Sequence, residues 1–197
     1  MSDDAIETFL KVFRDEDDHC HDEAETEPFP AYLEGIDTTL APFCPTSASR
    51  VLKALKMAQL TRGDRLLDLG SGDGRFVTAA AAMGAARAVG VETDDALVDL
   101  SQTLAARVPN GEKTEFIQGD LLEIPAVREF QWTVIVLFLL PDHTDKFADL
   151  LWKHYENGAR IVSLVFNLQE IPGLELQQAD EPDGIYVYYK PPGNFLG

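Results

Sequence analysis

The sequence predicts an α/β fold in which helices cover both faces of a doubly wound, mostly parallel sheet that an antiparallel C-terminal hairpin closes. Between residues 65 and 166, short apolar runs of strand length alternate with longer segments of helical periodicity. Strands that alternate with helices in this way form parallel sheets through right-handed crossovers. After residue 174, apolar and polar residues alternate on both sides of Pro-Asp-Gly at 182–184, which is typical of a β-hairpin.

Continuous apolar runs indicate strands that are covered on both faces of the sheet. The clearest run is 132–140, which is apolar throughout except at Thr133. The predicted parallel strands are 65–69, 87–92, 114–118, 132–140 and 159–166, and the predicted hairpin strands are 174–178 and 184–189.

Capping residues, prolines and glycines mark the ends of the predicted helices. Thr46 or Ser47 is placed to cap the helix that precedes the first strand. Pro141 suits the first position of a later helix, where no amide donor is needed, and Gly158 suits its C-terminal stop. The predicted helices are about 47–60, 74–84, 94–107 and 141–158, with a loop or short helix around Pro125.

The most informative segment is the junction between the first predicted strand and the helix after it. Residues 66–76 read Leu-Leu-Asp-Leu-Gly-Ser-Gly-Asp-Gly-Arg-Phe, with glycines at the alternate positions Gly70, Gly72 and Gly74. Glycine permits a positive φ and lets a ligand approach the main chain closely. The order of strand, glycine turn and helix therefore predicts a nucleotide-type ligand site, the alternative being a tight turn without a ligand.

Two acids in this loop indicate which ligand it takes. Asp68 stands at the end of the strand and Asp73 at the turn, and two negative charges there would repel the phosphates of a dinucleotide. They suit a ligand with an ammonium group. S-adenosylmethionine (SAM) carries one on its methionine end, together with a sulfonium and no phosphate. The spacing Asp-x-Gly-x-Gly-x-Gly resembles motif I of the class I SAM-dependent methyltransferases.

Further acids follow the next two predicted strands. Glu92 ends the second strand about twenty residues after the glycine loop, where doubly wound folds bind ribose hydroxyls. The alternative for Glu92 is an N-cap of the following helix, a role that Thr93 or Asp94 can fill equally well. Asp120 ends the third strand, where the methyltransferase pattern that the glycine loop resembles implies an acid that accepts from the adenine amino group, while the amide of Leu121 can meet the ring. Gly-Asp is also a common turn sequence.

Length and composition limit the domain organisation. The chain has 197 residues, 45% of them hydrophobic, which suits one well-buried domain and is too short for two ordinary ones. Its longest apolar run is strand-sized, so no membrane span is expected. Two cysteines provide no disulfide framework, and the acidic N-terminal segment resembles neither a secretory signal nor a transit peptide. We therefore expect a cytoplasmic protein.

The net charge of −18 is concentrated toward the N-terminus. The first 30 residues hold eleven acids against two basic residues, which divides the chain into an acidic arm, 1–38, and the ligand-binding domain, 39–197. The arm would either attract a basic protein partner or act as a solvated tail. Residues 2–14 have the pattern of a short amphipathic helix, and His19-Cys20-His21 lacks a second cluster that would complete a metal site. Without a basic stripe, nucleic-acid binding is not expected.

Four segments in their expected order resemble one family of small class I methyltransferases. This family includes the protein-lysine methyltransferases of the ATP synthase c subunit and of elongation factor 1 alpha, with bacterial relatives. The resemblance covers about residues 40–190 and implies the Rossmann-like class I methyltransferase fold. The segments are Pro42-Phe43-Cys44-Pro45-Thr46, Asp68-Leu69-Gly70-Ser71-Gly72-Asp73-Gly74-Arg75, Leu139-Leu140-Pro141 and Gly158-Ala159-Arg160-Ile161-Val162-Ser163.

The resemblance implies SAM as the cofactor, and no metal is expected, because no second Cys/His cluster completes a site. Asp68 and the glycine loop would hold its methionine end, Glu92 its ribose and Asp120 its adenine, while Thr46 would reach it from the preceding segment. The residues expected to bind the cofactor are Thr46, Asp68, Gly70, Ser71, Gly72, Asp73, Glu92, Asp120 and Leu121.

The loop after the fourth strand is expected to face the substrate through Leu139, Leu140 and Pro141. It lacks the Asn/Asp-Pro-Pro-Tyr pattern of enzymes that methylate exocyclic base amines. Asp142 and His143 are candidate proton acceptors, although a helix-dipole role and a plain surface role explain them as well.

The sequence thus predicts a methyltransferase that modifies a protein lysine. Its substrate would be a protein, of basic character if the acidic arm binds it, and neither nucleic acid nor membrane is expected as a partner. The alternatives are a small-molecule methyltransferase and a SAM-binding partner subunit without catalysis.

Overall fold

The computed structural model describes residues 3–24, 45–139 and 144–191, and the side chains of 19–24, 144 and 145 are not among those described. Leu140, Pro141, Asp142 and His143 therefore lie outside the described residues, as do the side chains of the His-Cys-His sequence. Within the described parts, no helix is long and apolar enough to cross a membrane.

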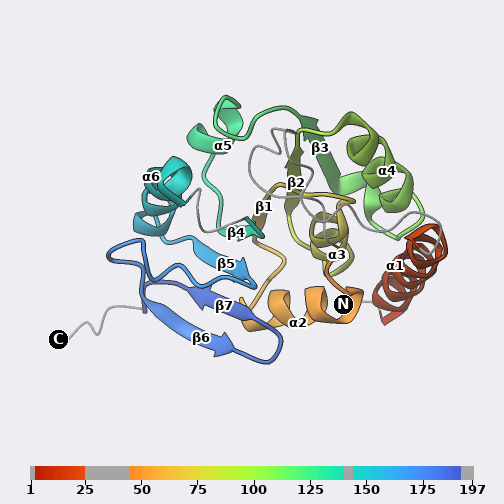
Figure 1. Cartoon of the computed structure of the whole chain (residues 1–197), viewed down its shortest axis with the longest axis horizontal. Coiled ribbons are helices and arrows are strands. Elements are labelled where there is room, and N and C mark those ends of the chain that lie inside the picture. The colour runs from red at the N-terminus through yellow and green to blue at the C-terminus, as the bar shows by residue number, and fades with distance from the viewer. Residues whose placement is uncertain (1–2, 25–44, 140–143, 192–197) are drawn as a thin grey trace.

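The described strands form one seven-stranded sheet in the order β3-β2-β1-β4-β5-β7-β6 (Figure 1). The first five are parallel, and β7 pairs antiparallel with both β5 and β6, so the predicted fold class is confirmed. The strands are β1 (Arg65–Leu69), β2 (Arg87–Glu92), β3 (Thr114–Gln118), β4 (Val134–Leu137), β5 (Arg160–Leu164), β6 (Leu176–Asp180) and β7 (Ile185–Tyr188).

The predicted fourth strand, 132–140, is too long. β4 covers only Val134–Leu137, because its register with β1 runs from Leu66–Val134 to Leu69–Leu137 and β1 ends at Leu69 in the glycine loop. Before β4, the indole of Trp132 turns aside and donates to the carbonyl of Ala126 at 3.0 Å.

The helices lie near their predicted positions. Ser47 stands at the N-cap of α2, as predicted, but its hydroxyl makes no capping hydrogen bond. The glycine after α6, Gly158, has φ = +87°, as a C-terminal stop requires. The helices are α1 (Asp3–Ala24), α2 (Ala48–Met57), α3 (Arg75–Ala82), α4 (Asp95–Ala105), α5 (Pro125–Glu129) and α6 (Thr144–Glu156), with a 3-10 turn, η1 (Gly111–Lys113).

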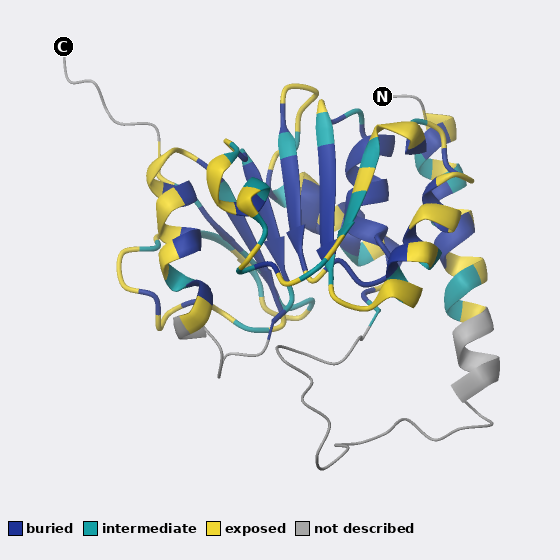
Figure 2. Cartoon of the chain, turned by 90° about the horizontal axis from the view of Figure 1, so that it is seen from above, coloured by how far each residue is buried: buried dark blue, intermediate teal, exposed yellow. Residues whose placement is uncertain are grey.

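Each face of the sheet has its own hydrophobic core, and the central strands are buried along most of their length (Figure 2). On one face, alternate strand residues such as Leu66 and Val136 pack with α1, α2, α3 and α4. On the other face, Leu67 and Ile135 pack with α5 and α6. This alternation is the period of two that a strand imposes on its side chains.

The predicted N-terminal helix is present and longer than expected, Asp3–Ala24 rather than 2–14. Its apolar residues Ala5, Phe9, Val12 and Phe13 are at most 5% exposed and belong to the core beside α2 and α3. The described part of the acidic segment is therefore packed onto the domain through one face. The boundary at residue 38 stays a prediction.

A partly buried ion pair lies at the amino ends of the strands. Arg160, from one of the family segments, pairs with Asp64 and also donates to the carbonyl of Ala58 at 2.6 Å. Burial alone would raise the pKa of Asp64, but hydrogen bonds from Thr133 and Thr61 bring that pKa below 3.8. Loss of Arg160 would leave the largely buried carboxylate of Asp64 without its charged partner, which is destabilising. Arg160 thus has a structural role.

Candidate functional site

The candidate site lies where the parallel strands end. The glycine loop follows β1, Glu92 ends β2, and Asp120 comes two residues after β3. Because β1, β2 and β3 are neighbours and parallel, their carboxyl ends meet at the same edge of the sheet. Open α/β sheets bind ligands at this edge.

The glycine loop is held in shape by its own backbone. The amides of Gly70 and Ser71 both donate to the carbonyl of Val91, at 3.0 and 2.9 Å, which ties the loop to the end of β2. Gly70, Gly72 and Gly74 have φ values of +78°, +53° and +76°. All three therefore occupy the conformation in which glycine is favoured over other residues.

Gly74 is restricted by its surroundings as well as by its φ. A Cβ added there would lie 2.5 Å from the ring of Phe116 on β3 and 2.8 Å from the Cβ of Ser101 on α4. The hydroxyl of Ser101 donates to the carbonyl of Gly72 at 2.9 Å. The start of α3 is thus packed directly against β3 and α4, and these contacts hold the glycine loop in place.

Asp68 is the most unusual residue of the site. Its side chain is buried, with the residue 4% exposed, and within the described part of the chain its carboxylate makes no hydrogen bond or ion pair. Burial raises the pKa of Asp68 well above 3.8, and the charges of Glu92 and Asp73 raise it further. A buried carboxylate without a partner is costly, so this geometry fits a ligand that brings a positive charge to the loop.

Ser71 is also buried without a partner. The residue is 6% exposed, and its hydroxyl makes no hydrogen bond within the described chain. A Cβ on Gly90 would lie 2.5 Å from that hydroxyl, which explains why β2 has a glycine at this position. The two polar groups left unpaired in this loop, Asp68 and Ser71, are both among the residues predicted to bind the cofactor.

Glu92 is fixed by backbone amides. Its Oε2 accepts from the amide of Gly72 at 2.9 Å, and its Oε1 accepts from the amide of Thr93 at 2.7 Å. The cap of α4 is instead Asp94, whose carboxylate accepts from the amide of Ala96 at 2.9 Å. The alternative role of Glu92 as that cap is therefore taken by Asp94, and Glu92 stands beside the glycine loop.

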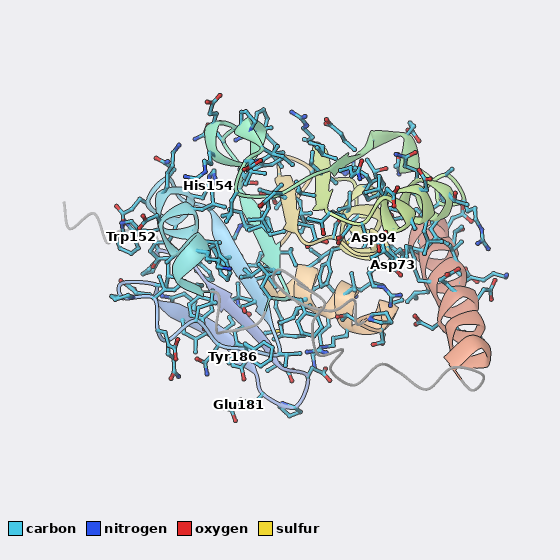
Figure 3. All side chains as sticks on the ribbon, turned by 45° about the horizontal axis from the view of Figure 1, so that its top comes forward. Asp73, Asp94, Trp152, His154, Glu181 and Tyr186 are labelled. Carbon is cyan, nitrogen blue, oxygen red and sulfur yellow. The ribbon has the colours of Figure 1, made fainter. Side chains whose placement is uncertain are left out.

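Asp73 has a different environment from Asp68. It is 1% exposed, and its carboxylate is paired with the guanidinium of Arg75, with Nη2 at 2.5 Å and Nε at 2.9 Å. Figure 3 shows Asp73 and Asp94 on the α1 side of the molecule. Arg75 neutralises Asp73, so the negative charge available to a ligand comes from Asp68 and Glu92. The cofactor contact predicted for Asp73 stays a prediction.

The remaining predicted contacts lie around the same edge. Asp120 is exposed, and its Oδ1 accepts from the amide of Leu122 at 2.8 Å, so the turn expected of Gly-Asp is present. Leu121 is buried, 4% exposed, and Thr46 is 5% exposed. Leu139, expected to face the substrate, lies against the glycine loop, since a Cβ on Gly70 would be 3.3 Å from its side chain.

Two residues that hold the site were not identified from the sequence. Ser101 is fully buried on a helix, where its hydroxyl supports the carbonyl of Gly72. Arg75 begins α3, where a positive charge opposes the helix dipole. An arginine in the first turn of a helix needs an acidic partner, and this unfavourable position is the feature of the sequence from which Arg75 could have been identified.

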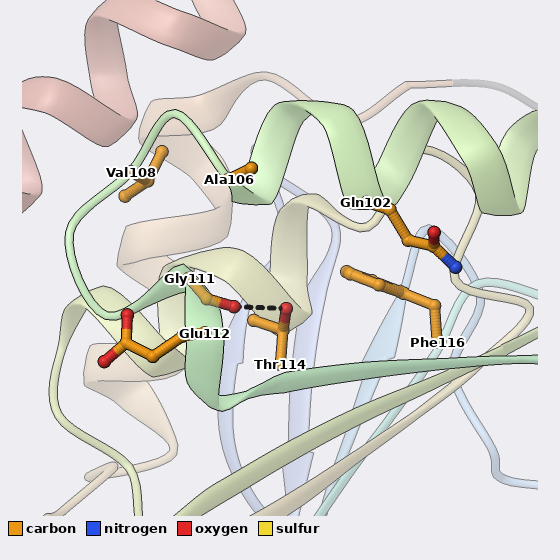
Figure 4. A pocket seen from close by; sticks show the side chains of 7 residues that line it. All are labelled: Gln102, Ala106, Val108, Gly111, Glu112, Thr114 and Phe116. Carbon is orange, nitrogen blue, oxygen red and sulfur yellow. Dashed lines mark hydrogen bonds between the residues drawn. The ribbon is translucent and has the colours of Figure 1, made fainter.

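A hollow of about 440 Å³ lies between α4, η1 and β3 (Figure 4). It is formed at the C-terminal part of α4 and the amino end of β3, where the hydroxyl of Thr114 donates to the carbonyl of Gly111 at 2.7 Å. The hollow is therefore at the opposite edge from the carboxyl ends of the strands. Its lining residues are Gln102, Ala106, Val108, Gly111, Glu112, Thr114 and Phe116.

Comparison with known proteins gives the family. The model of the ANTKMT methyltransferase domain matches residues 68–175. A protein-lysine N-methyltransferase of Saccharolobus islandicus is 31% identical over 65% of this chain and 78% of its own length. The rat lysine N-methyltransferase of the ATP synthase c subunit is 34% identical over 73% of this chain, which spans 63% of the rat protein.

Among solved structures, an RNA methyltransferase of Salinibacter ruber in complex with S-adenosylhomocysteine is 32% identical, with a TM-score of 0.64. The match covers 78% of this chain and 99% of that one. The matched family model begins at Asp68, so it includes the glycine loop, Glu92 and Asp120. The chain belongs to the ANTKMT methyltransferase domain family, and it is a methyltransferase.

Proposed function

We propose that this protein transfers a methyl group from SAM to a lysine side chain of a protein substrate. The cofactor assignment rests on the buried carboxylate of Asp68, which has no partner in the described chain. It lies beside the glycine loop, in which the amide of Gly72 donates to Glu92. The acceptor is proposed from two relatives, one named a protein-lysine N-methyltransferase and the other a lysine N-methyltransferase of the ATP synthase c subunit.

The residues at the carboxyl edge suit the parts of this cofactor in turn. Asp68 would pair with its ammonium group, Glu92 would accept from the ribose hydroxyls, and Asp120 would accept from the adenine amino group. Ser71 would give its unpaired hydroxyl to the same ligand. When bound, SAM supplies an electrophilic methyl group on a sulfonium.

The protein's own contribution to the transfer is alignment and control of a proton. A lysine amine with a solution pKa of about 10.4 is almost entirely protonated at neutral pH and must lose its proton before it can attack. Leu139, 7% exposed beside the glycine loop, contributes an apolar wall that would favour the neutral amine. We propose Asp142 or His143, which follow Leu139 closely in the sequence, as the group that takes the proton.

The nature of the acceptor has a second candidate, because the solved relative from Salinibacter ruber is described as an RNA methyltransferase. The net charge of −18 favours a protein, since a polyanion would be repelled and a basic protein attracted. The two cysteines in 197 residues agree with a reducing compartment, and we propose the cytoplasm. A small-molecule methyltransferase and a SAM-binding partner subunit remain outcomes of the test.

The test is transfer of labelled methyl from SAM into a cell extract, followed by separation of protein, RNA and small molecules. Asp68→Ala removes the proposed cofactor carboxylate. Asp99→Asn is the matched control, because Asp99 is exposed on α4, away from the glycine loop. Label in a protein band, present with Asp99→Asn and lost with Asp68→Ala, supports the proposal. Peptide mapping must then place the label on lysine.

Label only in RNA or only in small molecules would reject the protein substrate. Binding of S-adenosylhomocysteine without transfer to any fraction would favour the partner-subunit alternative.

A further inference from the structure

The guanidinium of Arg75 joins three segments that are far apart in the sequence. It pairs with Asp73 in the glycine loop, and its Nη2 lies 3.0 Å from Oδ1 of Asp17 on α1. Its Nη1 donates to the carbonyl of Thr46, the segment expected to reach the cofactor. Its Cζ lies 5.4 Å from the ring centre of Phe13, also on α1.

This arrangement is buried and depends on α1. Arg75 is 4% exposed and Phe13 is fully buried. Phe13 and Phe9 pack together with ring centres 4.9 Å apart, and both belong to the core beneath α1. Burial acts to lower the pKa of Arg75, but Asp73 and then Asp17 outweigh it, so the pKa is raised and the side chain stays charged. Without α1, the guanidinium would lose one carboxylate and the aromatic ring that covers it.

The position of Arg75 gives it an effect on the loop that binds the cofactor. Asp73 stands between Gly72 and Gly74, so holding its carboxylate fixes the turn between them. The amide of Gly72 then points at Glu92, the residue proposed for the ribose. The contact with Thr46 fixes the segment before α2 to the same guanidinium.

We infer that α1 is a part of the cofactor site, with Asp17 and Arg75 as positioning residues that couple docking of α1 to the shape of the glycine loop. The inference rests on the proposed function, because it takes the glycine loop as the SAM site. Coupling is reciprocal, so α1 strengthens binding of the cofactor and the cofactor strengthens docking of α1 by the same factor. The acidic N-terminal helix thereby acts on catalysis through the loop that binds the cofactor.

The experiment compares Asp17→Asn with Asp18→Asn in the full chain. The two residues are neighbours on α1, and each substitution removes one negative charge. Asp17 pairs with Arg75, whereas Asp18 is exposed and does not contact Arg75 within the described structure, so Asp18→Asn controls for the change in charge alone. Affinity for S-adenosylhomocysteine is measured by calorimetry. We expect about a five- to tenfold loss for Asp17→Asn, as for one charge-assisted hydrogen bond, and less than a twofold change for Asp18→Asn.

Hydrogen exchange of α1 supplies a readout that a purely structural contact would not move. S-adenosylhomocysteine should slow exchange in α1 of the wild-type protein, and slow it less in Asp17→Asn. Equal affinities for the two variants would overturn the inference, and so would exchange in α1 that the ligand leaves unchanged. In either case, binding of S-adenosylhomocysteine to the wild type would still support the cofactor assignment. Absence of binding to the wild type would instead overturn the proposed function, and this inference with it.

Discussion

The amide of Gly72 donates to the carboxylate of Glu92 at 2.9 Å, across 20 residues of sequence. This bond joins the loop after β1 to the end of β2, and it uses one oxygen of the residue proposed to bind the ribose. The shape of the loop and the position of a ligand-binding acid are thus set by the same contact.

Glu92→Gln should weaken binding of S-adenosylhomocysteine about tenfold. The glutamine side chain keeps one acceptor oxygen, but its NH₂ group would face the amide of either Gly72 or Thr93, which now donates to Glu92. The remaining hydrogen bond would also be weaker, because hydrogen bonds to a charged acceptor are stronger than those to a neutral one. Calorimetry measures the change. Glu115→Gln is the control, since Glu115 forms an exposed pair with Arg87. Equal affinities for the Glu92 variant and the wild type would remove Glu92 from the site.

Asp68→Asn should stabilise the free protein at neutral pH, because it removes the cost of a buried carboxylate without a partner, while it abolishes cofactor binding. Burial, with the charges of Glu92 and Asp73, raises the pKa of Asp68 in the folded state above its unfolded value of 3.8. The folded protein therefore holds a proton that the unfolded chain releases, and wild-type stability falls as the pH rises from 3.8 through the raised pKa.

Urea denaturation of the free protein from pH 4 to pH 8 measures this effect. The stability difference between Asp68→Asn and the wild type should widen as the pH rises. Asp99→Asn, on the exposed side of α4, should follow the wild type throughout. A variant at position 68 that was less stable than the wild type at pH 8 would show that the carboxylate has a partner.

Gly74→Ala should reduce the free energy of unfolding by about 2–5 kcal/mol. The change forces a side chain into φ = +76° and places its Cβ 2.5 Å from the ring of Phe116, so conformational strain and overpacking add. Gly158→Ala is the matched control, with φ = +87° and nothing within 4 Å of the added Cβ. It should lose only about 1 kcal/mol. Equal losses in denaturant titrations would contradict the crowding at Gly74.

His154 should make the protein less stable below pH 6.5. It is 2% exposed on α6, and its Nε2 donates to the carbonyl of Val127 at 2.8 Å. Burial lowers the pKa of His154 below 6.5, although the hydrogen bond to Val127 opposes the shift. As the pH falls below 6.5 the unfolded chain binds the proton first, which removes up to about 1.4 kcal/mol per pH unit.

His154→Gln keeps a donor for the carbonyl of Val127 and removes the titration. Its stability should therefore vary less than that of the wild type between pH 7 and pH 5, as measured by thermal unfolding. Parallel pH profiles for the two proteins would show that another group is responsible.

The sheet could be predicted closely because its central strands are buried. β1 and β2 match the predicted ranges, since a strand covered on both faces is apolar over most of its length. The edge strand β3 also matches its predicted range, although it is only partly buried. The glycine loop and Glu92 were found for a related reason, since close backbone approach and crossover geometry restrict both residue type and spacing.

The parts that were missed depend on contacts between distant segments. Asp17 and Arg75 are 58 residues apart, and no local pattern relates them. The length of β4 was overestimated because it depends on where the neighbouring strand ends. The burial of α1 is of the same kind: its periodicity predicts a helix, but its packing partners lie on α2 and α3.

The unpaired carboxylate of Asp68 has a consequence for the life of the protein in a cell. A ligand that pairs with it binds only the folded state, so a hundredfold excess of ligand over its dissociation constant would add about 2.7 kcal/mol of stability. Proteolysis samples the unfolded fraction, which the same ligand reduces. We therefore expect the half-life of the protein to lengthen when the concentration of cofactor is high. A pulse-chase in cells starved of methionine, compared with fed cells, would show this effect. The amount of enzyme would then follow the amount of methyl donor in the cell.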